Sequence, residues 1–89
     1  MIIIFDKKFD KKFKKISVKI QEKFFDRLRI FKNNKFEKIL NNHKLHGEYE
    51  GCNSINITSN YRAVFKIINK ENEEFCVFIT IGTHPGLYE

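Results

Sequence analysis

Hydrophobic positions near the start of the chain follow first a strand pattern and then a helix pattern. Residues 2–5, Ile-Ile-Ile-Phe, form an apolar run rich in β-branched residues and predict a short buried strand. Phe9, Phe13 and Ile16 then recur at helical spacing with lysines between them. Asp6 stands where an N-cap is needed, so we expect a short amphipathic helix directly after the strand.

A longer helix is predicted next. Ser17 suits an N-cap, and the helical pattern ends at the pair Asn33-Asn34. Its apolar positions are spaced by four, four and three residues: Ile20, Phe24, Leu28 and Phe31. The two helices should therefore form a hairpin. Residues 35–42 carry enough apolar positions for one further turn, and a polar loop is expected from Asn41 onward.

The second half of the chain changes to the alternating pattern of strands. Residues 52–58 alternate so that Asn53, Ile55 and Ile57 share a face toward the helices and the other face is polar. Residues 58–60, Thr-Ser-Asn, signal a turn, and residues 61–68 read as the return strand of a hairpin. If the turn loop has three residues, Asn56 lies opposite Arg62.

The remaining residues complete a sheet. A charged turn over 69–74 leads to residues 75–81, which are apolar on both faces as an interior strand should be. A turn over 82–86 and a short tail over 87–89 follow. The order βααβββ predicts an α+β fold in one domain, residues 1–89, with an N-terminal helical hairpin on one face of a mainly antiparallel sheet. The other face of the sheet is expected to be available.

Charge is distributed unevenly along this pattern. The chain has 17 basic and 11 acidic side chains, a net charge of +6, with +9 in residues 1–44 and −3 in residues 45–89. Clustered Lys and Arg favour a polyanionic partner such as a nucleic acid. An alternative is that AT-rich coding DNA supplied the abundant Lys, Ile, Asn and Phe.

Several classes of protein are excluded. The opening apolar run is too short for a signal peptide, and no apolar stretch of membrane-spanning length follows, which predicts a cytoplasmic protein without membrane contact. Cys52 and Cys76 show no metal-binding spacing and read as reduced strand residues. We expect no cofactor.

Three histidines are the first candidates for chemistry. His43 and His46 precede the first hairpin strand, and His84 follows the last strand. Imidazole is the side chain best suited to moving protons near neutral pH. A zinc site formed by the three is the alternative, but no carboxylate or Cys lies at ligand spacing, so we predict no metal.

Arg62 and Tyr88 are further candidates. Arg62 is one of only three arginines, and its planar guanidinium matches phosphate oxygens in two places. The alternative is an ion pair with Glu48, Glu50 or Glu74. Tyr88, near the end of the chain, either stacks on a splayed nucleobase or covers the sheet edge.

Three segments together resemble a known family. They are His43 to Gly51 with the pattern HxLxG, Ile55 to Phe65 with YRxxF, and Ile81 to Tyr88 with GTHxxLY. In this order, after a helical hairpin, they resemble the RelE/ParE toxin superfamily, and most of all its YafQ-like mRNA interferases. The resemblance covers essentially the whole chain.

The resemblance implies a function. It implies the toxin of a type II toxin–antitoxin pair, held inactive by a cognate antitoxin protein. Such toxins enter the ribosomal A site, with its 16S rRNA, and cleave mRNA. They are metal-independent endoribonucleases in which a ribose 2′-hydroxyl attacks the adjacent phosphate and leaves a 2′,3′-cyclic phosphate.

Individual residues take roles from the same resemblance. His84 matches the proton-transferring histidine, and His43 matches the loop histidine. Arg62 matches the arginine that stabilises the pentacovalent phosphate, and Tyr88 matches the aromatic residue that positions the substrate base. The residues expected to bind substrate are His46, Asn56, Lys66 and Lys44.

The chain also departs from the family pattern. Asn56 stands where Arg or His is usual, Asn60 where Asp is common, and Asn53 where a basic residue is frequent. An amide carries no charge and moves no proton near pH 7. Either His43 or His46 makes up for this, or the protein is a slower nuclease or a catalytically silent RNA-binding relative. A ParE-like inhibitor of DNA gyrase is a separate alternative. In each nucleic-acid reading the lysine-rich helices are the docking surface for phosphates.

Overall fold

The chain folds into one sheet with two helices packed on the same core. The computed structural model describes residues 1–88, and the side chains of residues 1–87. Five strands stand in the order β1-β5-β4-β3-β2, with β1 parallel to β5 and the other pairs antiparallel. The elements are β1 (Ile2–Phe5), α1 (Lys7–Phe13), α2 (Val18–Asn33), the 3-10 helix η1 (Lys38–Leu40), β2 (His43–Lys44), the 3-10 helix η2 (Gly47–Tyr49), β3 (Asn53–Asn56), β4 (Tyr61–Lys70), β5 (Glu73–Thr83) and α3 (His84–Tyr88). The expected α+β fold with a mainly antiparallel sheet is confirmed.

Both main helices begin at the expected caps. The Asp6 carboxylate accepts a hydrogen bond from the backbone N–H of Lys8 at 2.8 Å, and the Ser17 hydroxyl accepts one from Ile20 at 3.3 Å. Each bond satisfies one of the N–H groups that the first helical turn leaves without a partner. The predicted end of the second helix at Asn33 is also confirmed.

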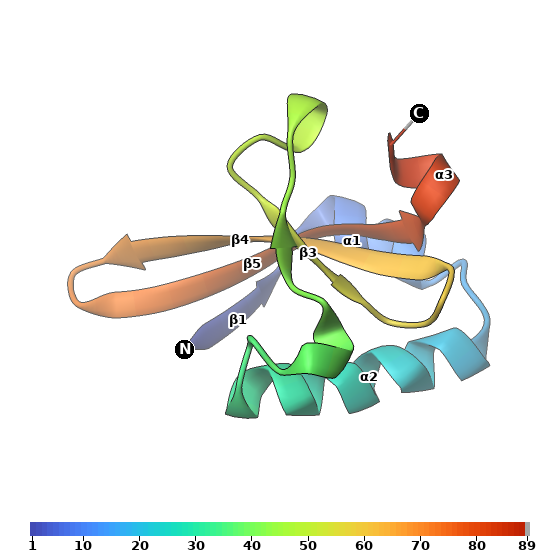
Figure 1. Cartoon of the computed structure of the whole chain (residues 1–89), viewed down its shortest axis with the longest axis horizontal. Coiled ribbons are helices and arrows are strands. Elements are labelled where there is room, and N and C mark those ends of the chain that lie inside the picture. The colour runs from blue at the N-terminus through green and yellow to red at the C-terminus, as the bar shows by residue number, and fades with distance from the viewer. Residues whose placement is uncertain (89) are drawn as a thin grey trace.

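Aromatic rings join the helices to the sheet. Phe9 of α1 and Phe24 of α2 both meet Phe78 of β5, with ring centroids 5.9 and 5.5 Å apart. Phe31 meets Phe65 of β4 edge-on at 5.0 Å. All five rings are buried. In Figure 1, α2 crosses below the sheet and α3 lies above it, so the long helix covers only one of the two faces.

The β3–β4 hairpin has the predicted register. Asn56 pairs with Arg62, and the backbone N–H of Ile57 donates to the carbonyl of Tyr61 at 2.9 Å. The loop between Ile57 and Tyr61 therefore has three residues. Side chains at even positions of β4 consequently face away from the helices.

A bulge in β5 changes which of its side chains face the core. Val64 of β4 pairs with Thr80, but the next residue, Phe65, pairs with Phe78, which leaves Ile79 as the extra residue. The bulge reverses the alternation, so that Phe78 and Ile81 both face the helices. The expectation that this interior strand is apolar on both faces is confirmed.

The first strand lies differently from the expectation. Residues 2–5 were expected to be buried, but Ile2, Ile4 and Phe5 are exposed. β1 pairs only with β5 and forms an edge of the sheet. An edge strand of this kind keeps one side open to solvent.

The end of the chain is also more ordered than predicted. Gly82 and Thr83 continue β5, and the expected turn and tail are the single helical turn α3. Pro85 suits the first turn of a helix, where its missing N–H costs nothing. Leu87 is buried and anchors the turn against the sheet.

The segments expected to be loops are shorter than predicted. The expected polar loop after Asn41 contains β2 and η2. The predicted order βααβββ therefore lacked β2, and it also lacked α3, which follows β5. The charged turn narrows to Glu71 and Asn72, both with positive φ as a two-residue hairpin turn requires. The additional helical turn after α2 is the 3-10 helix η1. None of the described helices is long and apolar enough to cross a membrane.

Candidate active site

The candidate site lies on the face of the sheet away from α2. Strand register arranges its side chains in two rows that cross the sheet. One row is His43, Ser54, Val64 and Thr80. The neighbouring row is Asn56, Arg62 and Gly82. Directly paired residues point to the same side of a sheet. Register thus places residues from a span of 40 positions, His43 to Gly82, on one surface.

His43 is held by hydrogen bonds on both ring nitrogens. Its Nδ1 lies 2.8 Å from the carbonyl oxygen of Asn41, and its Nε2 lies 3.4 Å from the hydroxyl oxygen of Ser54. A carbonyl oxygen only accepts hydrogen bonds, so Nδ1 carries a proton. In the neutral ring Nε2 then has a lone pair, and the imidazole is exposed enough to be reached by a substrate.

Arg62 lies against the turn between β3 and β4. Its Nη1 donates to the carbonyls of Thr58 and Ser59, each at 3.0 Å, and to that of Tyr61 at 3.2 Å. Among the described residues, no acceptor takes up the N–H groups of Nη2 and Nε. The guanidinium is therefore held in place with donors left for an anion.

The alternative ion pair of Arg62 is wrong. Glu74 instead pairs with Lys35, at 2.9 Å. Glu48 and Glu50 form no ion pair with Arg62 in the described part of the chain. The arginine is partnered by backbone carbonyls, which leave its charge uncompensated.

His84 begins α3 beside the same turn. Its backbone N–H donates to the carbonyl of Asn60 at 2.9 Å. The β3–β4 turn thus contacts both Arg62, through its side chain, and His84, through its backbone. The side chain of His84 is exposed.

An apolar floor with unpaired polar atoms lies under this face. Leu45, Cys52, Val64 and Leu87 form a second buried cluster, with Tyr49 and Ile79 packed against it. The prediction of a polar face is therefore only partly right, because buried apolar side chains also lie on this face. Among the described side chains, the buried oxygens of Asn56 and Thr80 have no hydrogen-bond partner. Asn56 sits in the row of Arg62, where that oxygen can accept a hydrogen bond.

The expected substrate-binding residues do not all share the face. Lys66 is exposed and lies on the side of Arg62, four residues along β4. Lys44 follows His43 directly in β2 and so points to the opposite side of the sheet. With His46, it lines a separate pocket of about 330 Å³ that also contains Glu50.

The remaining predictions about the site concern Tyr88 and the alternative zinc site. The backbone of Tyr88 belongs to α3, but its side chain lies outside the described part. Among the described side chains, His43, His46 and His84 do not gather into a group that could hold a metal ion. The alternative zinc site has no such cluster to support it.

Two partners of His43 were not identified from sequence. Ser54 was one of several alternating polar residues in a strand, with nothing to single it out. Asn41 contributes a backbone carbonyl, which any residue type carries. Only the left-handed conformation of Asn41, with φ of 47°, distinguishes it, and Asn is one of the residues that tolerate this region.

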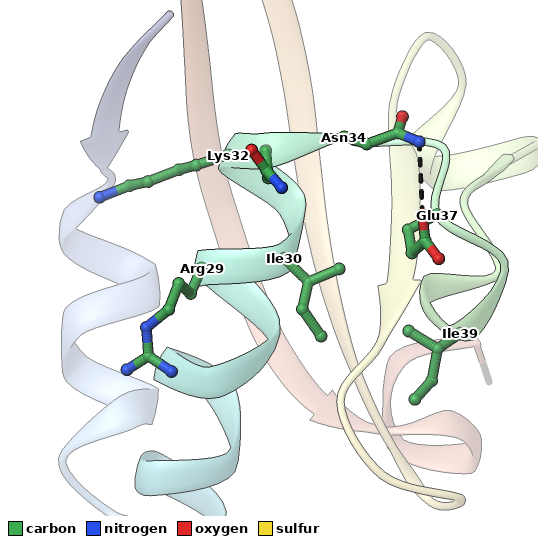
Figure 2. Close-up of a pocket in the computed structure, with 7 residues that line it drawn as sticks. Arg29, Ile30, Lys32, Asn34, Glu37 and Ile39 are labelled. Carbon is green, nitrogen blue, oxygen red and sulfur yellow. Dashed lines mark hydrogen bonds between the residues drawn. The ribbon is translucent and has the colours of Figure 1, made fainter.

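A separate open groove lies on the helix side, in the segment that precedes Asn41 and His43. Figure 2 shows it between the end of α2 and the segment that carries η1. Its volume is about 800 Å³. The lining residues are Arg29, Ile30, Lys32, Asn33, Asn34, Glu37 and Ile39. Asn34 donates to Glu37 across one rim at 3.4 Å, and the other rim carries two cations.

The structure is similar to solved bacterial toxins. It matches YafQ from E. coli strain BL21(DE3) with a TM-score of 0.79 and 18% sequence identity, covering 98% of this chain and 97% of that one. It matches the YoeB/ParE toxin from Agrobacterium tumefaciens with a TM-score of 0.75 and 21% identity, covering 94% and 99%. No protein-family model and no curated protein sequence matches the chain.

Two further matches contain a second protein. One is the E. coli DinJ-YafQ toxin-antitoxin complex, with a TM-score of 0.76, 19% identity and coverage of 98% and 96%. The other is the YoeB-YefM complex from Staphylococcus aureus, with a TM-score of 0.70, 20% identity and coverage of 94% and 97%. The near-complete coverage in both directions shows that the chain has the fold of the YafQ, YoeB and ParE toxins.

Proposed function

We propose that this protein is the toxin of a type II toxin–antitoxin pair and cleaves mRNA as a metal-independent endoribonuclease. The observation that carries the proposal is the face of the sheet away from α2. There an imidazole with an available lone pair and a guanidinium with available donors share one open surface. The fold of the YafQ and YoeB toxins supports the same assignment.

The reaction needs two proton transfers and one charge stabiliser. Nε2 of His43 takes the proton of a ribose 2′-hydroxyl, and the oxygen attacks the adjacent phosphorus. Arg62 donates to the non-bridging oxygens as negative charge builds up on the pentacovalent phosphate. His84 protonates the departing 5′-oxygen. The products are a 2′,3′-cyclic phosphate and a 5′-hydroxyl.

The remaining candidates bind rather than react. Asn56 lies in the row of Arg62, and its buried side-chain oxygen, which has no partner among the described side chains, would turn outward to meet a ribose hydroxyl. Lys66 lies on the same side and suits a flanking phosphate. Lys44 and His46, in their separate pocket, would contact RNA farther along the strand. Tyr88 is proposed to stack on a base.

The ribosome is the proposed place of action. The lysines on the exposed sides of α1 suit the phosphates of 16S rRNA near the A site. This division keeps docking and chemistry on different elements. It also makes the protein cytoplasmic in our proposal.

Mapping of mRNA 5′ ends after induced expression tests the proposal. New ends in phase with codons are expected if the protein cleaves ribosome-bound mRNA. Accumulated cleaved DNA complexes without new mRNA ends would instead identify a gyrase inhibitor. Intact ribosome binding without either product would identify a silent RNA-binding relative.

Variants assign the chemistry to the site. His84→Ala and Arg62→Ala should each relieve growth arrest while the protein stays folded, because losing one proton-transfer or charge-stabilising group costs about 10²–10³ in rate. Lys70→Ala is the control, since this exposed cation lies at the far end of β4 and has no part in the proposed site. Unchanged toxicity in both site variants would contradict the assignment.

An antitoxin is the proposed protein partner. Two of the structural matches are complexes with a second protein, one of them described as a toxin-antitoxin complex. The groove in Figure 2 offers Ile30 and Ile39 beside Arg29 and Lys32, which suits an acidic amphipathic segment. Copurification with the product of the adjacent reading frame is expected. Failure of that protein to bind would count against the pairing.

A further inference from the structure

The segment that carries His43 is locked from three sides. Asn41 ends η1 in a left-handed conformation, with its backbone N–H bonded to the carbonyl of Lys38 at 3.1 Å. The Asn42 amide donates to the carbonyl of Lys35 at 2.9 Å. Asn53 of β3 donates to the Asn42 side-chain oxygen, also at 2.9 Å. These contacts fix the backbone immediately before the histidine.

This locked segment aims one carbonyl group at the imidazole. The oxygen of Asn41 lies 2.8 Å from Nδ1 of His43, a short distance for such a bond. The same peptide could not turn this oxygen away without breaking the amide contacts of Asn42. The proton on Nδ1 is therefore specified by the fold.

The other ring nitrogen faces a hydroxyl group. Ser54 pairs directly with His43 across β2 and β3 and is fully buried. Because Nε2 has no proton in this tautomer, the Ser54 hydroxyl donates to it, at 3.4 Å. A bond this long is weak, so an incoming hydroxyl can replace it.

We infer that the Asn41 carbonyl and the Ser54 hydroxyl are positioning groups that select the Nδ1–H tautomer of His43 and make Nε2 the proton-accepting atom. The Asn42–Asn53 amide contact holds the carbonyl in place. The inference rests on the proposed function for its chemical meaning, since the hydroxyl that replaces Ser54 would be the ribose 2′-hydroxyl. Its structural content, the tautomer, stands apart from any activity.

Nitrogen-15 NMR of the histidine rings tests the tautomer directly. At about pH 8 an ordinary imidazole is neutral, so each ring nitrogen reports whether it carries a proton. We expect a protonated Nδ1 and an unprotonated Nε2 for His43, assigned by loss of its signals in His43→Gln. A protonated Nε2, or an even mixture of tautomers, would overturn the inference.

Variants of the positioning residues test its cause. Asn53→Ala removes the Asn42–Asn53 amide contact and should shift His43 toward a mixture of tautomers. The control is Asn69→Ala, an exposed Asn→Ala change on β4, which should leave the His43 signals unchanged. Ser54→Ala should move the Nε2 resonance without altering protonation at Nδ1. If Asn53→Ala leaves the His43 signals as in the wild type, the Asn42–Asn53 contact does not help to select the tautomer.

A paired substitution connects the tautomer to catalysis. His43→Asn places an amide N–H near the position of Nδ1 and can keep the bond to Asn41, but it has no base at the position of Nε2. We expect an unchanged melting temperature and a loss of RNA cleavage of about 10²-fold or more. Cleavage equal to that of the wild type would overturn Nε2 as the base.

The two proposals fail in distinguishable ways. If the wild-type NMR shows Nδ1–H but no mRNA is cleaved, the tautomer assignment stands and the proposed function falls. If mRNA is cleaved but His43 is protonated on Nε2, the proposed function stands and the positioning role falls.

Discussion

At the residue scale, backbone carbonyls orient two of the charged or titratable side chains of the site, those of His43 and Arg62. One carbonyl holds the imidazole of His43, and a set of turn carbonyls holds the guanidinium of Arg62. Neither side chain is partnered by a carboxylate among the described residues. Because a carbonyl is neutral, it orients the side chain without cancelling the charge that an RNA phosphate would meet.

Cys76 is a residue whose burial has a measurable consequence. It is a fully buried core residue of β5, and burial raises the pKa of its thiol from 9.0 to about 12, with nearby Lys35 opposing this and Glu74 adding to it. The folded protein therefore keeps the thiol proton at a pH where the unfolded chain loses it.

This difference predicts a loss of stability in alkali. Below pH 9 both states keep the proton, so the thiol does not affect the pH dependence. Between pH 9 and about 12 unfolding releases one proton, so the free energy of unfolding falls by up to about 1.4 kcal/mol per pH unit. Urea titrations from about pH 8 to 10 should show a steeper decline for the wild type than for Cys76→Val. Equal slopes would contradict the buried-thiol assignment.

At the element scale, α3 places the candidate general acid. The helix is a single turn, and Leu87 fastens it to the face of the sheet away from α2. Gly82 makes room for this contact, since a Cβ there would lie only 3.3 Å from the Leu87 side chain. The anchor acts together with the backbone hydrogen bond from His84 to Asn60, so its loss should loosen the position of His84.

Leu87→Ala should therefore lower both stability and activity. Truncating a buried leucine costs about 2–5 kcal/mol, and a terminal turn that can detach belongs at the lower end. RNA cleavage should fall further than the folded fraction does, because His84 loses its position. The control is Ile39→Ala, at a half-exposed isoleucine on η1, which should change little. Full activity of folded Leu87→Ala would contradict the positioning role of α3.

At the scale of the whole molecule, charge and chemistry are separated. The half of the chain with net charge +9 forms α1 and α2, while Arg62 and His84 come from the half with net charge −3. His43 belongs to the first half but lies on strand β2 of the sheet, not on a helix. Long-range attraction to RNA should thus come from the helices, and the reaction from the sheet. In our proposal the two contributions respond to different variants.

Salt dependence of RNA binding separates them. Each phosphate contact contributes about 0.7 to the slope of log affinity against log salt for single-stranded RNA. Replacing the exposed Lys11 of α1 and Lys14 at its C-cap by Gln should reduce that slope by about 1.4, with cleavage of saturating RNA unchanged. Lys70→Gln, at the far hairpin end, is the control. A slope equal to that of the wild type would exclude α1 as the docking surface.

The sequence by itself determined the features that depend on neighbouring residues. The caps at Asp6 and Ser17, the helical spacing that ends at Asn33, and the three-residue turn that pairs Asn56 with Arg62 are all local signals. Short motifs in the right order also indicated the toxin fold. Local hydrogen bonds and periodic burial suffice to specify such features.

Only the tertiary structure decided the features that depend on distant contacts. The two-residue strand β2, the bulge at Ile79 and the anchored turn α3 have no periodic signal of their own. β1 was apolar enough for an interior strand, yet its position at the sheet edge leaves it exposed. Apart from the Ser54 hydroxyl, the partners of His43 and Arg62 are backbone carbonyls, which every residue carries. Their selection depends on where the folded chain aims them, because residue type does not encode the direction of a carbonyl.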